Sequence, residues 1–188
     1  MDNSLQTIQK ITNAFKILSK IVMICCIVGA IGCAIGIISI AFLPDAFKIG
    51  GVNIHGIVEK TADESIATGY AAMAFGMITC IGYSILGKLY FKYFDAELKA
   101  GTPFTIEGAK QLNLLGLYTI CIPLICNFAT EIVLQILKKT MEDVADVDIN
   151  YYSSVVFGLL IMIIGLLCKY GAELVGVNKE QVENNEIL

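Results

Sequence analysis

Four polar residues and one proline recur at every fourth position in the third long apolar segment of the chain. They are Thr119, Pro123, Asn127, Glu131 and Gln135. In an α-helix this spacing forms a stripe that drifts slowly around one face. An ionisable residue in a membrane span is a functional candidate, because its charge is costly to hold in hydrocarbon. Glu131 is therefore the candidate coupling or selectivity residue of a transport path.

A second explanation of Glu131 stays open. At about 1.5 Å per residue, the segment 112–137 is about 39 Å long as a helix, whereas the hydrocarbon core is about 30 Å thick. The carboxylate can then lie among the outer headgroups, where water solvates it. In that case the charge of Glu131 has no role in transport.

Enzyme signatures are missing from the sequence. There is no HExxH, GxSxG or Walker motif, and no pair of intramembrane aspartates. The only histidine, His55, lies in a loop, and the seven cysteines all lie in apolar segments, where they act as small packing residues. We therefore predict no enzyme, no catalytic residue, no cofactor and no metal site. A net charge of -4 gives no basic field, so we also expect no direct nucleic-acid binding.

The composition places the chain in a membrane. Of the 188 residues, 56% are hydrophobic and 16% are charged, and the mean hydropathy is +0.74. A soluble domain carries about 25% charged residues. We predict an all-α, integral membrane four-helix bundle that forms a single membrane domain and contacts the lipid bilayer. Its spans are 21–43, 66–86, 112–137 and 151–168, and a connector, 87–111, joins the two halves.

The N-terminal segment carries apolar residues at helical spacing. These are Leu5, Ile8, Ile11, Phe15 and Leu18. The pattern predicts an amphipathic N-terminal helix that lies on the inner leaflet. The alternative is that these residues form the first turns of a long first helix.

Glycines mark expected close contacts between helices, because a missing side chain lets two backbones approach. The residues predicted for helix packing are Gly29, Gly32, Gly36, Gly69 and Gly76. A further pair, Gly50–Gly51, is expected to form the turn of a small β-hairpin in the loop after the first span.

Orientation follows from the lysines, since the chain contains no arginine. Nine lie on the side of the termini and the connector: Lys10, Lys16, Lys20, Lys88, Lys92, Lys99, Lys110, Lys169 and Lys179. Four lie in the other two loops: Lys48, Lys60, Lys138 and Lys139. The positive-inside rule then places both termini and the connector in the cytoplasm. Abundant Lys, Ile and Asn are typical of an AT-rich bacterial genome, so we expect a multi-pass protein of a bacterial plasma membrane.

The connector contains signals that end one helix and begin the next. Gly101 is suited to terminate the first helix, and Thr102 or Thr105 to cap the second, with Pro103 or Glu107 in its first turn. Phe104 is placed to pack against the aromatic end of the second span. The residues of a candidate docking surface are Gly101, Pro103, Phe104, Thr105 and Glu107.

The run Gly101-Thr-Pro-Phe-Thr-Ile-Glu-Gly-Ala-Lys-Gln-Leu, followed by Gly116, resembles the YoaS-like family of uncharacterised bacterial four-span membrane proteins, a domain-of-unknown-function family. The tail Tyr170-Gly-Ala-Glu-Leu174 and the ending Asn185-Glu-Ile-Leu188 are similar to that family as well. Val175-Gly-Val-Asn-Lys departs from the acidic run that is usual there. The resemblance implies a membrane partner for a cytoplasmic regulator protein.

Two hypotheses of function follow. The first is a non-enzymatic membrane interaction or regulatory protein, with the connector and the acidic tail as contact surfaces. The alternative is a small transporter or channel subunit, in which Thr119, Asn127, Glu131 and Gln135 line the path. Four spans enclose little volume, so the alternative requires a homo-oligomer.

Overall fold

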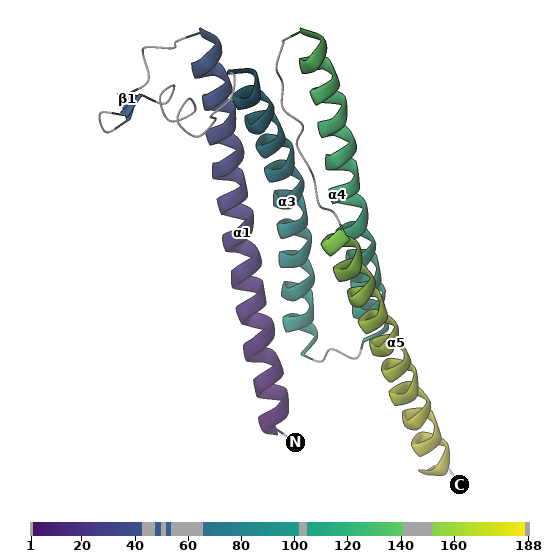
Figure 1. Ribbon diagram of the computed structural model, residues 1–188. Helices are drawn as coiled ribbons and strands as arrows, with labels where there is room; N and C mark the ends of the chain where they lie inside the picture. The colour runs from purple at the N-terminus through teal and green to yellow at the C-terminus, as the bar shows by residue number, and fades with distance from the viewer. Residues whose placement is uncertain are drawn as a thin grey trace. The chain divides into compact units, whose positions relative to one another are not determined.

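The part of the chain that the structure describes folds into four long helices and one small hairpin (Figure 1). This computed structural model describes residues 2–42, 48–49, 52–53, 66–101, 105–140 and 152–186. The helices are α1 (Asp2–Phe42), α3 (Ile66–Ala100), α4 (Ile106–Thr140) and α5 (Tyr152–Glu186). All four are long and apolar enough to cross a membrane. The predicted fold class, an all-α membrane protein with four spanning helices, is confirmed.

The hairpin pairs two short antiparallel strands, β1 (Lys48–Ile49) and β2 (Val52–Asn53). Lys48 lies opposite Asn53, and Ile49 lies opposite Val52. Gly50 and Gly51, at which the turn was predicted, lie outside the described residues.

The helices are longer than a bilayer needs. α3, α4 and α5 have 35 residues each, and α1 has 41. Thirty-five residues rise about 52 Å, against about 30 Å of hydrocarbon, so each helix extends well beyond the apolar layer. The connector 87–111 is therefore mostly helix: α3 continues to Ala100, and α4 begins at Ile106.

The N-terminal segment and the first span form one uninterrupted helix, α1. Residues 2–20 are helical, as the periodicity predicted, and they make up the first turns of this long helix. This outcome corresponds to the second of the two alternatives given above for the segment.

The chain divides into two compact units. The first contains Met1–Ile21, Leu86–Cys121 and Tyr152–Leu188, and the second contains Val22–Ile85 and Ile122–Tyr151. α1, α3 and α4 each contribute residues to both units, because each helix runs through the boundary, whereas α5 belongs wholly to the first.

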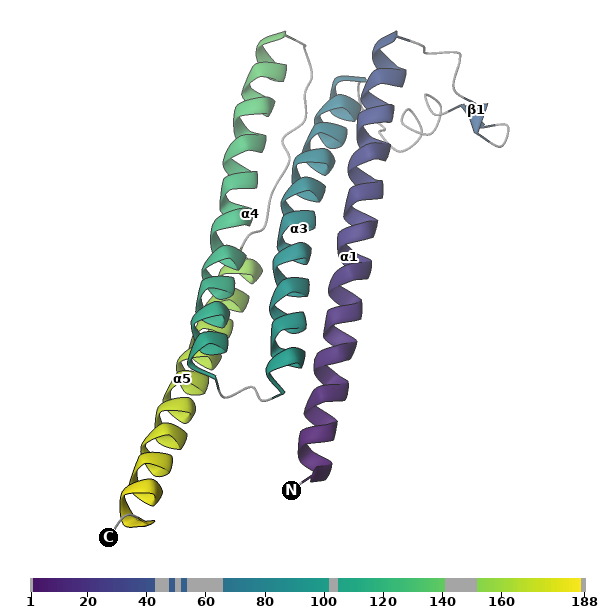
Figure 2. The same ribbon diagram turned by 180° about the vertical axis from the view of Figure 1, so that it is seen from behind.

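In the first unit, α4 and α5 lie side by side (Figure 2). The two helices meet at two glycines. A Cβ atom on Gly116 would lie 2.8 Å from the carbonyl oxygen of Gly158, and a Cβ on Gly158 would lie 2.8 Å from that of Gly116. The two backbones are therefore in direct contact. No larger residue fits at either position without moving a helix.

In the second unit, small residues bring α1 against α3. A Cβ on Gly29 would lie 3.1 Å from Cys80 Sγ, and one on Gly76 would lie 3.1 Å from Cys33 Sγ. Gly36 packs against the thioether of Met73. The seven cysteines are all free thiols, and these two fill space beside glycines, as small apolar residues do.

Two of the predicted packing glycines differ in their surroundings. Gly69 is buried, whereas Gly32 is exposed and has no atom within 4 Å of the position of a Cβ. The helix contact therefore uses the seven-residue spacing from Gly29 to Gly36, and Gly32 points away from α3. Seven residues are close to two full turns, which returns a residue to the same face.

Candidate functional site

The junction of α3 and α4 is fixed by two helix caps. Gly101 has a φ of +73°, and its N–H donates to the carbonyl oxygen of Glu97 at 3.1 Å. This is the left-handed cap that glycine adopts at low cost. The Thr105 hydroxyl accepts from the N–H of Gly108 at 3.0 Å, and Glu107 lies in the first turn of α4. Gly101 and Thr105 therefore have the capping roles predicted for them.

The remaining predicted residues of the connector, Thr102, Pro103 and Phe104, lie outside the described residues. We use the name elbow for residues 86–100 of α3, Gly101, Thr105 and residues 106–111 of α4. The rest of the candidate site is built on this elbow and on the parts of α1 and α5 within the same unit.

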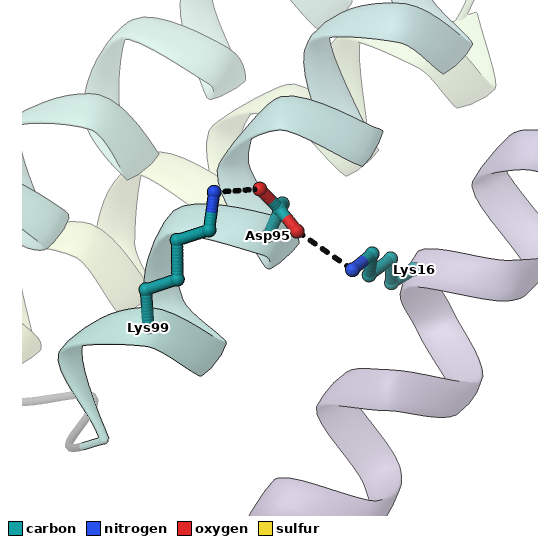
Figure 3. A network of polar contacts seen from close by, with 3 residues as sticks. All are labelled: Lys16, Asp95 and Lys99. Atoms are coloured by element: carbon teal, nitrogen blue, oxygen red, sulfur yellow. Dashed lines mark hydrogen bonds and ion pairs between the residues drawn. The ribbon is translucent and has the colours of Figure 1, made fainter.

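A charge network joins α1 to the elbow (Figure 3). The Asp95 carboxylate accepts from Lys16 Nζ at 2.6 Å and from Lys99 Nζ at 2.7 Å. Asp95 lies near the polar end of α3, beyond the predicted span. The hydrogen bonds from Lys16 and then Lys99 lower the pKa of Asp95 to about 2.

Aromatic contacts reinforce this junction. The rings of Phe15 on α1 and Phe94 on α3 stack with their centroids 5.6 Å apart, and Tyr93 meets Phe94 edge-on at 5.3 Å. The Lys16 ammonium also lies 5.5 Å from the ring centroid of Phe91. Lys16 thus binds α3 through both a carboxylate and an aromatic face.

Glu97 is the buried acid of the elbow. Only 9% of its surface is exposed, and its Oε2 has no hydrogen-bond partner among the described residues. The Oε1 atom of Glu97 occupies the space beside Gly108, and a Cβ atom on residue 108 would collide with this oxygen. Burial raises the pKa of the Glu97 carboxyl. A glycine at position 108 therefore makes room for a carboxyl group between α3 and α4.

The polar stripe of α4 does not form one buried path. Thr119 is buried, donates to the carbonyl oxygen of Leu115 at 2.8 Å and shares a 2.8 Å hydrogen bond with the Tyr90 hydroxyl. These two bonds satisfy the hydrogen-bonding capacity of the Thr119 hydroxyl, which is a structural role. α4 continues through Pro123 as one helix.

Further along the stripe, the side chains become exposed. Asn127 is half-buried, and its Oδ1 has no hydrogen-bond partner in the part of the chain that the structure describes. Glu131 and Gln135 are exposed. A path lined by these three residues would therefore lie on the outside of a single chain.

Sequence reasoning did not identify Asp95 or Glu97 as site residues. A weak signal was present, because Asp95 and Lys99 have the i, i+4 spacing of a helix ion pair. No sequence pattern indicates that Glu97 is buried, because its burial depends on where α4 packs against α3. Among the described residues, no group of three or more His, Cys, Asp and Glu side chains is arranged to hold a metal ion.

Comparison of the chain with known protein families, with curated proteins and with solved structures finds no match. The resemblance to the YoaS-like family therefore stays a prediction.

Proposed function

We propose that this chain is a non-enzymatic membrane protein that binds a cytoplasmic regulator protein through the tip of the elbow, by which we mean Ile106, Glu107 and Lys110. The observation that supports the proposal most is the set of contacts that hold the described parts of the elbow in place. The elbow is capped at Gly101 and Thr105, and the Lys16–Asp95 ion pair ties it to α1. A docking surface benefits from such preorganisation, because little conformational entropy is then lost on binding.

The chemistry of the tip suits a protein partner. Ile106 is 48% exposed, and the exposed charged residues Glu107 and Lys110 lie beside it in the first turns of α4. An apolar residue with a polar rim is the usual pattern of a protein interface. The lysine asymmetry supports a cytoplasmic location of this tip, in a bacterial plasma membrane.

Site-specific photo-crosslinking in native membranes tests the proposal. A photoreactive residue at Lys110 should give a defined crosslinked product, whereas the same residue at Lys139, exposed at the other end of α4, should not. The product at Lys110 should decrease when Glu107→Lys reverses a charge of the tip. Identical products at both positions would reject the proposal. A Lys110 product whose amount is unchanged by Glu107→Lys would also reject it.

A second candidate function rests on a separate observation. The unpartnered Asn127 Oδ1 and the exposed Glu131 and Gln135 lie on an α4 face that a second copy is able to cover. We propose a homo-oligomeric transporter or channel as the alternative function. Mass photometry in lipid nanodiscs tests it, because a protein that is monomeric at all concentrations has no enclosed path.

A further inference from the structure

A groove runs between α3 and α4 in the first unit. Its volume is about 510 Å³, and its lining includes Leu89, Leu114, Leu115 and Tyr118, which we call the apolar floor. The groove is partly open to the outside of the helix pair. An apolar floor of this kind is suited to a hydrocarbon chain.

The groove also carries charged side chains, since Lys92, Asp95 and Lys99 are among the residues that line it. Asp95 is already paired with Lys16 of α1 as well as with Lys99, which leaves this group of charges with a net positive charge. Lys92 is exposed and has no ion pair with any described residue. The chain has no arginine, so a phosphate group would meet lysine ammonium groups here.

The aromatic residues indicate the depth of the groove. Phe91, Tyr93 and Tyr118 also line it. Tyrosine is enriched where the hydrocarbon meets the headgroups, because its ring is apolar and its hydroxyl is polar. The groove thus combines apolar side chains, tyrosines and lysines, which is the chemistry expected where a phospholipid changes from acyl chain to phosphate.

The floor also continues onto surface that is suited to lipid. Leu114 and Leu117 on α4 are 48% and 45% exposed. An acyl chain on the floor would therefore remain in contact with apolar side chains towards the membrane, whereas a peptide would leave them uncovered.

We propose that the α3–α4 groove binds an anionic phospholipid, with the phosphate at Lys92 and Lys99 and one acyl chain on the apolar floor. The lipid is held at the junction that the Lys16–Asp95 ion pair stabilises. Anionic lipid in the inner leaflet would then strengthen the packing of the elbow. This binding site is independent of the proposed protein partner, whose surface is the tip of the elbow.

The chain contains no tryptophan, so a single introduced tryptophan reports on its own surroundings. The Tyr118→Trp variant is reconstituted into vesicles that contain brominated phosphatidylglycerol or brominated phosphatidylcholine at equal mole fraction. Bromine quenches tryptophan fluorescence on contact. We expect a relative binding constant for phosphatidylglycerol of about five, the factor that corresponds to one lysine at an anionic surface. The Phe128→Trp variant, at a residue 71% exposed on α4, should give a ratio of about one.

Lys92→Gln in the Tyr118→Trp background should lower the ratio towards one, and Lys139→Gln should leave it unchanged. Because tryptophan adds volume to the groove, native mass spectrometry of the wild-type chain in mixed micelles provides a second measurement. Preferential retention of phosphatidylglycerol, reduced by Lys92→Gln, would support the site. A ratio of one together with equal retention of the two lipids would overturn it. Weak quenching by both lipids at Tyr118→Trp would also overturn it, because another occupant would then cover the floor.

Discussion

The Asp95 carboxylate of α3 accepts a hydrogen bond from the Lys16 ammonium of α1 at 2.6 Å, although 79 residues separate the two in sequence. This contact fixes the angular position of α1 against the elbow. The stacked rings of Phe15 and Phe94 lie beside it. Asp95 also binds Lys99, so a single carboxylate is paired with one lysine of α1 and one lysine of α3.

Substitution of Asp95 by asparagine should lower the Tm in detergent by a few degrees. The variant leaves Lys16 and Lys99 without their common anion, whereas partial exposure of Asp95 limits the loss. Glu173→Gln is the matched control, since Glu173 has one exposed lysine partner at 3.8 Å. Equal thermal shifts of the two variants would contradict a structural role for Asp95.

The pH dependence of the Asp95 contribution has a defined direction. The pKa of this carboxyl is lowered to about 2 in the folded chain, so the folded state favours the charged form. Its stabilisation is complete above the usual pKa of about 4 and disappears as the pH falls towards 2. The Tm difference between the wild type and Asp95→Asn should therefore shrink below pH 4.

Glu97→Gln should act in the opposite direction. Burial raises the pKa of Glu97, so the folded state favours the protonated form, and stability from this group decreases as the pH rises through the folded pKa. The amide of the Glu97→Gln variant stays neutral at every pH, so this loss of stability does not occur in the variant. We expect a higher Tm for Glu97→Gln than for the wild type at pH 8, with a smaller difference at pH 5. Glu107→Gln, at an exposed position, should leave the profile of the wild type unchanged.

Local features of this fold were predictable from the sequence because they depend on neighbouring residues. The left-handed cap at Gly101 requires only a residue without a Cβ. The Thr105 cap requires a hydroxyl three positions before an N–H. Long apolar runs likewise predicted the four helices.

Features that depend on helix rotation were not predictable. Gly29, Gly32 and Gly36 all fit one face by spacing alone, yet the structure turns Gly32 away from α3. The burial of Glu97 likewise depends on the approach of α4 at Gly108, eleven residues later in the chain. Periodicity alone does not reveal how α3, α4 and α5 are rotated against each other.

Gly116→Ala should be destabilising, and Gly32→Ala should not. The added methyl group at 116 would lie 2.8 Å from the backbone oxygen of Gly158, which cannot move without shifting α5. Overpacking of this kind costs about 1–3 kcal/mol. At Gly32, nothing lies within 4 Å, and alanine favours the helix by about 0.5–1 kcal/mol. Guanidinium or SDS unfolding of both variants measures the difference, and a stable Gly116→Ala variant would show that α4 and α5 are not in backbone contact.

Glu131→Gln should leave the stability of the isolated chain unchanged, to within about 0.5 kcal/mol. Glu131 is exposed on α4, so the loss of its charge breaks no contact inside the chain. If Glu131→Gln changes only the formation of the oligomer or the ion flux in vesicles, the result would favour the transporter or channel alternative. A large loss of stability in the monomer would instead place Glu131 in the packed interior.

The two ends of α4 should lie on opposite sides of the membrane. Lys110 and Lys139 are 29 residues apart in one continuous helix, a rise of about 43 Å that exceeds the hydrocarbon thickness of about 30 Å. In a variant without the seven native cysteines, Lys139→Cys should react with a membrane-impermeant maleimide in intact cells. Lys110→Cys should react only after permeabilisation, because the positive-inside rule predicts that the lysine-rich side faces the cytoplasm. Labelling of both positions in intact cells would place the elbow outside the cell, where a cytoplasmic regulator is unable to reach it.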